Sequence, residues 1–254
     1  FCYDALHRRV ARLETRTANG EPGTVNTLTY FIHDGWNVIS EFSSSPHLPV
    51  SKSPSLRLVW GYDLSGTPQA GGGIGGLLST TENREQRTEN WFSYDSNGNV
   101  VLLTNTQGKE SARYSYDAFG KTLTATGEAA QRNKYRFSTK PVEEASGLCF
   151  YGYRYYAPCL GRWTRKDPVW EKGGINLMAI NQNDLVNKTD MMGLFPWISD
   201  GIDWITEQAE ESCDNVKSRE MCVICCGLVE GARGALGMAE TMTGIGTAAA
   251  GLGS

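Results

Sequence analysis

The stretch "YSYDAFGKT", residues 114–122, decides the fold, because it joins an alternating segment to a tight turn. In this stretch an aromatic residue precedes Asp117, and Gly120 follows three residues after the acid. An aspartate side chain accepts hydrogen bonds from backbone amides two residues on, and glycine adopts the positive φ that tight turns need. The stretch therefore predicts two antiparallel strands joined by a turn.

The same pattern recurs through the first half of the chain, for example in "YDLSGT" (62–67) and "YDSNGNV" (94–100). The aromatic–aspartate pairs are Tyr3-Asp4, His33-Asp34, Tyr62-Asp63, Tyr94-Asp95 and Tyr116-Asp117. One hairpin cannot bury its own apolar face, so repeated hairpins must pair side by side. The pattern predicts a mainly β fold, with a repeat sheet over residues 1–115.

Composition supports this fold class and limits the function. The chain has 254 residues with 29 glycines, 11 tyrosines and 7 tryptophans, which suits strands and turns better than helix bundles. Its net charge of −4 comes from an acidic end, residues 195–254, and neither part carries a basic stripe. Nucleic acid is therefore not expected as a partner. Charged residues interrupt the apolar stretch 221–253, so membrane contact by the tail is only a minor alternative.

Residues 116–194 form a block of ordered motifs rather than a repeat. They are "YDAFG" (116–120), "RF" (136–137), Lys140, "GL" (147–148), "YGYRYY" (151–156), "GRW" (161–163), "DP" (167–168), "GGINL" (173–177) and Asp190 with "GL" (193–194). This series resembles the core module of RHS/YD-repeat proteins. The resemblance implies a β-sheet spiral that forms part of a hollow shell, a core module over 116–194, and a variable C-terminal segment over 195–254.

The resemblance also implies a function. Such a shell encapsulates or displays its C-terminal segment, in proteins that are toxin-related and secreted or associated with the cell surface. The expected partners are the chain's own C-terminal segment and further repeats before residue 1. No leader opens the chain, but it begins within a repeat, so export is not excluded.

A second implication is self-cleavage by an aspartic protease. Carried over by position, the catalytic acids are Asp167 and Asp190, and the cut after Leu194 releases residues 195–254. Arg162 is the expected supporting residue, paired with a carboxylate. Two carboxyls held close together cannot both ionise, so one keeps a proton to polarise the carbonyl while the other activates water.

Two departures leave an uncut shell end as the alternative. Met191 follows Asp190 where the family has proline, and "NDL" (183–185) replaces an Asn-Asn-Pro step. Proline fixes φ, so its loss removes one constraint on the geometry near the cut. Both acids also fit an ordinary role as turn residues before Pro168 and Gly193.

Two other stretches have competing interpretations. "QAGGGIGGLL" (69–78) has the Gly-x-Gly-x-x-Gly spacing of a dinucleotide site at Gly71, Gly73 and Gly76, but no strand and helix flank it, which favours a turn or a close backbone approach. The aromatic run 150–156 alternates as a strand covered on both faces does. If those rings were exposed, an adhesive or carbohydrate-binding module that recognises a cell-surface glycan or protein would be the third functional alternative.

The tail after Leu194 has a different residue composition. Apolar residues at 198, 202, 205 and 209 predict an amphipathic helix. Four cysteines follow, and they fit disulfides in an exported protein, a zinc site, or reduced core thiols. These are Cys213, Cys222, Cys225 and Cys226. No cofactor is expected elsewhere in the chain.

Overall fold

The computed structural model describes residues 1–17, 24–44, 53–82 and 87–194. All of them lie within one compact unit, Phe1–Gly201. The described elements are strands and short 3-10 turns, which confirms the mainly β prediction. The tail helix and the cysteine alternatives fall in 195–254, outside the described residues.

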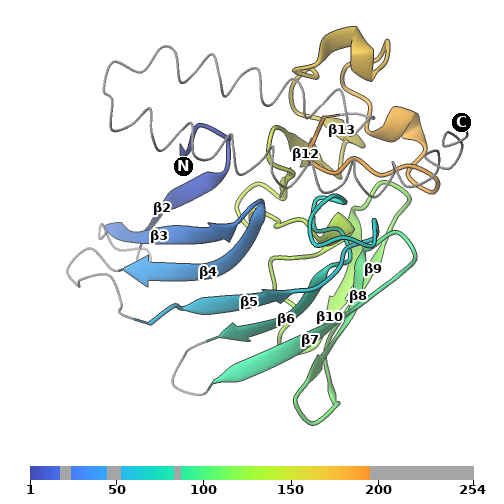
Figure 1. Cartoon of the computed structure of the whole chain (residues 1–254). Helices are drawn as coiled ribbons and strands as arrows, with labels where there is room; N and C mark the ends of the chain where they lie inside the picture. Colours follow the sequence, from blue (N-terminus) through green and yellow to red (C-terminus); the bar gives the residue numbers. More distant parts are fainter. Residues whose placement is uncertain (18–23, 45–52, 83–86, 195–254) are drawn as a thin grey trace, which may run out of the picture. The chain divides into compact units, whose positions relative to one another are not determined.

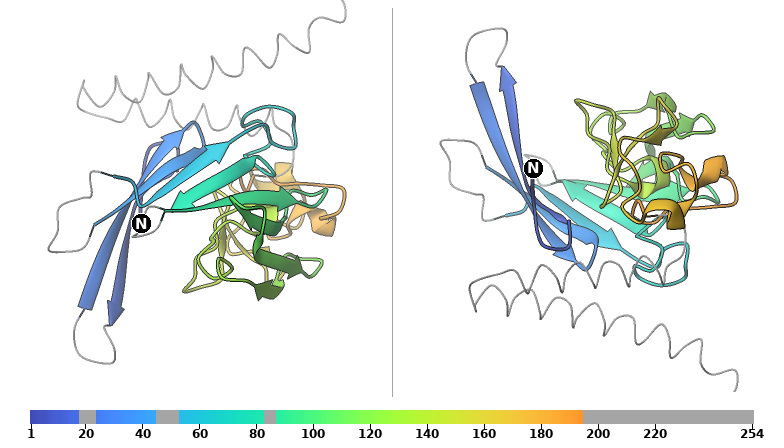
Figure 2. Two further views of the ribbon diagram at one scale, coloured as in Figure 1. Left: turned by 90° about the horizontal axis from the view of Figure 1, so that it is seen from below. Right: turned by 90° about the horizontal axis from the view of Figure 1, so that it is seen from above.

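Within the described residues, ten strands form one sheet in which each strand pairs antiparallel with the next (Figure 1). They are β1 (Cys2–Tyr3), β2 (Arg9–Thr17), β3 (Thr24–Asp34), β4 (Asn37–Ser44), β5 (Leu56–Trp60), β6 (Leu77–Glu82), β7 (Thr88–Tyr94), β8 (Val100–Asn105), β9 (Glu110–Tyr116) and β10 (Thr122–Thr126). Figure 2 shows the sheet strongly twisted, with the blue strands β2 and β3 crossing the direction of the green strands. Neighbouring strands are rotated relative to one another in a fixed sense, and this twist accumulates over the many strands of the sheet.

Every second turn of such a meander lies at the same edge of the sheet. The aromatic–aspartate pairs all fall in these alternate turns, so we call this side the YD edge. It comprises the turns at residues 4–8, 34–37, 62–76, 95–99 and 117–121. The sequence period is therefore one hairpin, and each repeat returns the chain to the same edge.

The turn at Asp95 shows how the repeat residues work. The Asp95 Oδ1 atom accepts hydrogen bonds from the amides of Asn97 and Asn99, both at 2.9 Å. Gly98 has a φ of +71°, which lets its amide donate back to the Asp95 carbonyl at 3.1 Å. The same pair of side-chain bonds, to the amides two and four residues on, is made by Asp4, Asn105 and Asp117.

The turn that contains the glycine-rich stretch is longer. The Asp63 Oδ2 atom accepts hydrogen bonds from the amides of Gly71 at 2.7 Å and Gly73 at 3.1 Å. In a dinucleotide site these backbone amides would bind phosphate, whereas here they bind the Asp63 carboxylate. A dinucleotide site would also be followed by a helix, whereas this turn is followed by strand β6. The stretch is therefore a turn, as the flanking sequence indicated.

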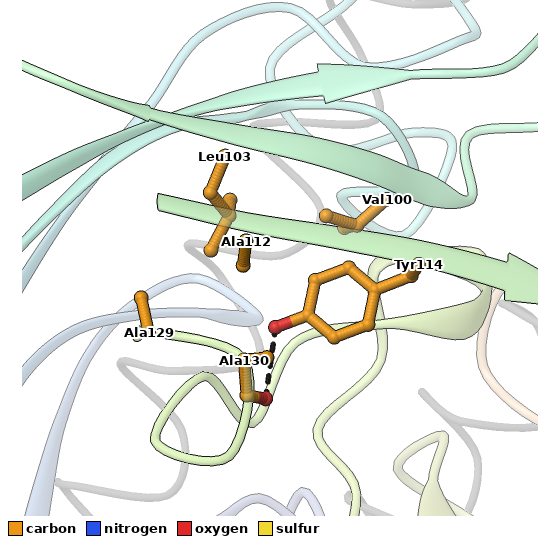
Figure 3. Close-up of a cluster of buried hydrophobic side chains, with 6 residues drawn as sticks. All are labelled: Val100, Leu103, Ala112, Tyr114, Ala129 and Ala130. Carbon is orange, nitrogen blue, oxygen red and sulfur yellow. Dashed lines mark hydrogen bonds between the residues drawn. The ribbon is translucent and has the colours of Figure 1, made fainter. Parts of the chain in front are cut away.

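The core beneath β8 and β9 is covered by the segment that follows β10 (Figure 3). The Tyr114 hydroxyl donates to the Ala130 carbonyl at 3.0 Å and ties this segment to the sheet. The buried side chains are Val100, Leu103, Ala112, Tyr114, Ala129 and Ala130.

Residues 133–194, which we call the core block, have little regular structure. A small sheet is formed by β11 (Cys149–Phe150), β12 (Tyr155–Ala157) and β13 (Arg162–Trp163), and the 3-10 turns are η1 (Phe137–Thr139), η2 (Trp170–Gly173) and η3 (Asn181–Asn183). The predicted division between residues 115 and 116 falls inside β9, and the large sheet continues to Thr126. The predicted division into residues 1–115, 116–194 and 195–254 stays a prediction.

The aromatic run 150–156 is not one continuous strand, contrary to the expectation from its alternation. Gly152, with a φ of +114°, separates β11 from β12. Tyr151, Tyr156 and Trp163 are buried together, with edge-to-face ring pairs 5.0–6.1 Å apart. Tyr153 is buried as well, and Phe150 and Tyr155 are half-buried, so no ring of this run is fully exposed for stacking on a glycan.

The core block packs against the YD edge and reaches each of its turns. Rings of His7 and Trp36 pack on Tyr153, at centroid distances of 5.3 and 5.4 Å. The remaining turns are reached by hydrogen bonds: Lys140 Nζ to the Gly72 carbonyl at 2.7 Å, Asn97 Nδ2 to the Leu185 carbonyl at 2.7 Å, and the Tyr156 hydroxyl to the Phe119 carbonyl at 2.8 Å.

Candidate functional site

Asp190, one of the two predicted catalytic acids, opens a turn of the same kind as the repeat turns. Its Oδ1 atom accepts hydrogen bonds from the amides of Met192 at 3.2 Å, Gly193 at 2.7 Å and Leu194 at 2.9 Å. Gly193 has a φ of +76°, as glycine three residues after the acid does in the YD turns. The carboxyl of Asp190 is thus fixed against the segment that ends at Leu194.

Asp167, the second predicted acid, also lies in a turn. Its Oδ1 atom accepts a hydrogen bond from the Val169 amide at 3.0 Å, and its carbonyl accepts one from the Trp170 amide at 3.1 Å. Trp170 stands where the repeat turns have glycine, yet it too has a positive φ, +56°. Asp167 is 4% exposed and Asp190 is 3% exposed.

The second oxygens of the two carboxyls converge on one cation, Arg154. The Arg154 Nη2 atom lies 2.7 Å from Asp167 Oδ2 and 3.2 Å from Asp190 Oδ2. The guanidinium is buried and lies over the Trp163 ring, 4.2 Å from its centroid. Two acids that are 23 positions apart in the sequence are therefore brought to the same nitrogen atom.

Burial sets the proton affinities of this group. It raises the pKa of Asp190 above its ordinary value, against the lowering effects of Arg154 and of the amides of Leu194 and Gly193. Burial also lowers the pKa of Arg154, although both carboxylates act in the other direction. A raised carboxyl pKa next to a second acid is the arrangement that lets one of two carboxyls keep a proton.

Lys140 is a buried cation that the sequence singled out only as part of a motif. Its Nζ atom donates to the carbonyl of Met191 at 2.6 Å and to that of Gly72 at 2.7 Å. Burial lowers its pKa to about 8, with Asp190 and Asp63 opposing the shift. The ammonium group thus holds the backbone next to Asp190.

Each carbonyl of the segment 191–193 has a donor from the core block. Met191 is bound by Lys140, the Met192 carbonyl accepts from the Tyr153 amide at 3.0 Å, and the Gly193 carbonyl accepts from Arg154 Nε. A partly open cavity of about 80 Å³ borders this segment at Met191 and Lys140. That volume holds several water molecules.

Arg162 does not take the supporting role that the sequence predicted. Strand alternation at β13 turns Trp163 into the core, so the neighbouring Arg162 side chain is exposed. Arg154 pairs with both acids instead. The alternation of residues 150–156 predicts one continuous strand through Arg154, whereas the structure breaks this strand at Gly152.

No cluster of metal-binding side chains is found among the residues that the structure describes. The same residues include no helix long and apolar enough to cross a membrane. The alternative zinc ligands, Cys213 to Cys226, lie outside the described ranges.

Comparisons with known proteins agree with the fold. Residues 77–132 match the RHS Repeat family model. Over 132 residues, half of this chain and 6% of the relative, the chain is 32% identical to the tRNA3(Ser)-specific nuclease WapA of Bacillus spizizenii. Over 84 residues, 33% of this chain and 8% of the relative, it is 37% identical to toxin subunit YenC2 of Yersinia entomophaga.

The fold is similar to that in the crystal structure of TcdB2-TccC3-TEV, with a TM-score of 0.59 and 20% identity over 76% of this chain and 9% of that one. The chain spans less than a tenth of the length of each of these three proteins. The repeat motif, the antiparallel sheet and the matched family model agree that residues 77–132 carry an RHS repeat.

Proposed function

We propose that this chain is the closing end of a toxin-related RHS shell, which encloses a C-terminal segment beginning after Leu194. The observation that carries the proposal is the packing of the core block against every turn of the YD edge. A repeat sheet grows by adding hairpins, and each hairpin adds one more turn to this edge. A block that binds these turns covers one side of the growing sheet.

The proposal names two partners. Further repeats before residue 1 would continue the sheet at β1, whose outer side has no neighbouring strand within the described residues. The enclosed partner would be the chain's own residues 195–254. Relatives named as a nuclease and a toxin subunit support a toxin-related role, and with that role we propose export to the cell surface or the medium.

Protease protection tests this function. An epitope tag is placed after Ser254 in the complete protein that carries this chain, and a second tag is placed in the exposed turn at Gln107 in a separate variant. Enclosure predicts that the C-terminal tag survives digestion long after the tag at Gln107 is removed. Equal loss of both tags contradicts enclosure and indicates that the tail is displayed.

Self-cleavage is a second candidate, favoured by the convergence of Asp167 and Asp190 on Arg154. The bond that breaks is the peptide between Leu194 and Phe195. Asp190, whose pKa burial raises, would keep a proton and give it to the leaving side, while Asp167 takes a proton from water. The resulting hydroxide adds to the Leu194 carbonyl carbon, and the products are a carboxylate at Leu194 and an amine at Phe195.

Two contacts support this step. Asp167 makes the shorter contact with Arg154, at 2.7 Å, and we assign it the role of the base. Asp190 is bonded to the Leu194 amide, so it lies directly beside the residue whose carbonyl is attacked.

Intact mass measured during incubation of the purified 254-residue chain tests the cleavage. The expected product ends at Leu194, and either Asp167→Asn or Asp190→Asn abolishes it. Asp117→Asn is the matched control, because it makes the same change in the same kind of turn on the YD edge. An uncut wild-type chain after long incubation would remove this candidate and leave the shell proposal standing.

A further inference from the structure

The glycine-rich turn between β5 and β6 contacts the predicted cleavage segment, which lies more than a hundred residues further along the chain. A Cβ atom on Gly72 would overlap the carbonyl oxygen of Met191. Gly72 also has a φ of +64°, so both its conformation and its surroundings exclude a side chain. Two backbones meet here at a distance that only glycine permits.

The turn is itself held firmly. The Asp63 carboxyl fixes the amides of Gly71 and Gly73, and Thr139 Oγ1 accepts from the Gly75 amide at 2.7 Å. Asp63 is 6% exposed, so these bonds are shielded from water. The part of the turn that faces Met191 is therefore braced on both sides of Gly72.

Lys140 joins the turn to the segment. Its Nζ atom lies 2.7 Å from the Gly72 carbonyl and 2.6 Å from the Met191 carbonyl, so one ammonium group binds both backbones. The segment continues through Asp190, whose carboxyl binds the amides of Gly193 and Leu194. Displacement of Met191 would be passed on to Asp190 and to the Leu194 peptide.

We propose that residues 70–76, held by Asp63, are a clamp that positions the segment 190–194 for cutting, and so fulfil the task that a proline at position 191 would have. This inference rests on the proposed self-cleavage. Proline would restrict the backbone from within the segment. The clamp restricts the same residue from outside, through steric contact at Gly72 and the shared Lys140 bonds.

The test compares Gly72→Ala with Gly108→Ala in the 254-residue chain. Gly108 has a φ of +74° and no atom within 4 Å of the position that a Cβ would take, so its substitution adds the same backbone strain without the contact. Gly72→Ala is expected to slow release of the fragment 1–194 by roughly 10- to 100-fold, because small misplacements of a reacting group have effects of that size. Gly108→Ala is expected to cut at the wild-type rate.

Hydrogen exchange in a peptide that covers residues 187–194 is the second readout, and it needs no cleavage. The clamp predicts faster exchange there in Gly72→Ala, while Gly108→Ala matches the wild type. If the wild-type chain is never cut, the self-cleavage proposal fails, and the exchange result alone supports or overturns the clamp. Unchanged cutting and unchanged exchange in Gly72→Ala overturn it.

Asp63→Asn is a second variant that tests the clamp if the Gly72→Ala chain does not fold. This change replaces one carboxyl oxygen by an NH2 group, so either the donors of Ser65 or those of Gly71 and Gly73 lose their acceptor. It loosens the turn without touching the segment 190–194. The clamp predicts the same direction of change in cutting and exchange, by a smaller factor, and an Asp63→Asn chain identical to the wild type in both would contradict it.

Discussion

Two turns of this molecule share one local design and differ in their surroundings. Asp117 and Asp190 each bind amides two and four residues on through Oδ1, and each is followed at the third position by a glycine with positive φ. Asp117 is exposed on the YD edge, whereas Asp190 is buried in the core block. The contrast shows that the turn alone gives no reactivity.

The second carboxyl oxygen makes the difference. At Asp190 it lies 3.2 Å from a buried guanidinium that also binds Asp167. Burial raises the pKa of Asp190 above its ordinary value, against the lowering effect of Arg154. The interpretations of Asp190 as a turn acid and as a candidate catalytic acid are therefore compatible, because different oxygens serve the two roles.

The largest effect is expected from removing the shared cation. Arg154→Met leaves two buried carboxyls without their partner and should lower the free energy of unfolding by about 3–5 kcal/mol at neutral pH. Arg113→Met is the control, since Arg113 and its partner Glu110 form an exposed pair on β9 and should change little. Urea denaturation measures both. Similar small losses would show that Arg154 is not needed to hold the acids together.

The strands and turns of the ten-stranded sheet could be predicted from the sequence, because they depend on residues that are close together in the chain. An acid, a glycine three residues later and alternating flanks fix a hairpin wherever they occur. The aromatic–aspartate pattern does not predict the turn at Asn105, because no such pair marks it, although asparagine makes the same two hydrogen bonds. Its "N-T-Q-G" spacing was the available signal.

The core block could be predicted only in part, because its contacts join distant residues. The resemblance gave Asp167 and Asp190, but not the arginine between them. Arg154 lies in a run whose alternation indicated a strand, and the direction of its side chain depends on the break at Gly152. No short sequence motif predicts the contact of Gly72 with Met191, because it depends on how the whole core block packs against the YD edge.

A smaller effect is expected from a repeat turn. Asp117→Ala removes the acceptor of two amides, at Phe119 and Lys121, and should lower the free energy of unfolding by about 1–2 kcal/mol. Asp117→Asn keeps an acceptor oxygen and should be close to neutral, as the natural Asn105 turn suggests. Thermal or urea unfolding distinguishes the two. A large loss in the asparagine variant would mean that charge matters at the YD edge, and would weaken the contrast with Asp190.

The smallest effect concerns pH, and the two regions should respond with opposite sign. Burial, together with Arg8, lowers the pKa of His33 on β3 to about 4. Between about pH 6.5 and about pH 4 the unfolded chain binds a proton that the folded chain excludes, so this group removes stability as the pH falls. Because His33 is partly exposed, roughly 1 kcal/mol is expected.

As the pH falls, Asp190 changes the stability in the opposite direction to His33. Its pKa is raised in the folded chain, so the folded state binds the proton more readily and this group adds stability as the pH falls. The test measures the free energy of unfolding of the wild type and of His33→Gln over that pH range. The contribution of Asp190 is the same in both chains and cancels in the difference, which therefore reports on His33 alone. The His33→Gln chain should keep more of its stability in acid. If both chains lose stability in parallel, His33 does not resist protonation, and the acid sensitivity must be assigned to another part of the sheet.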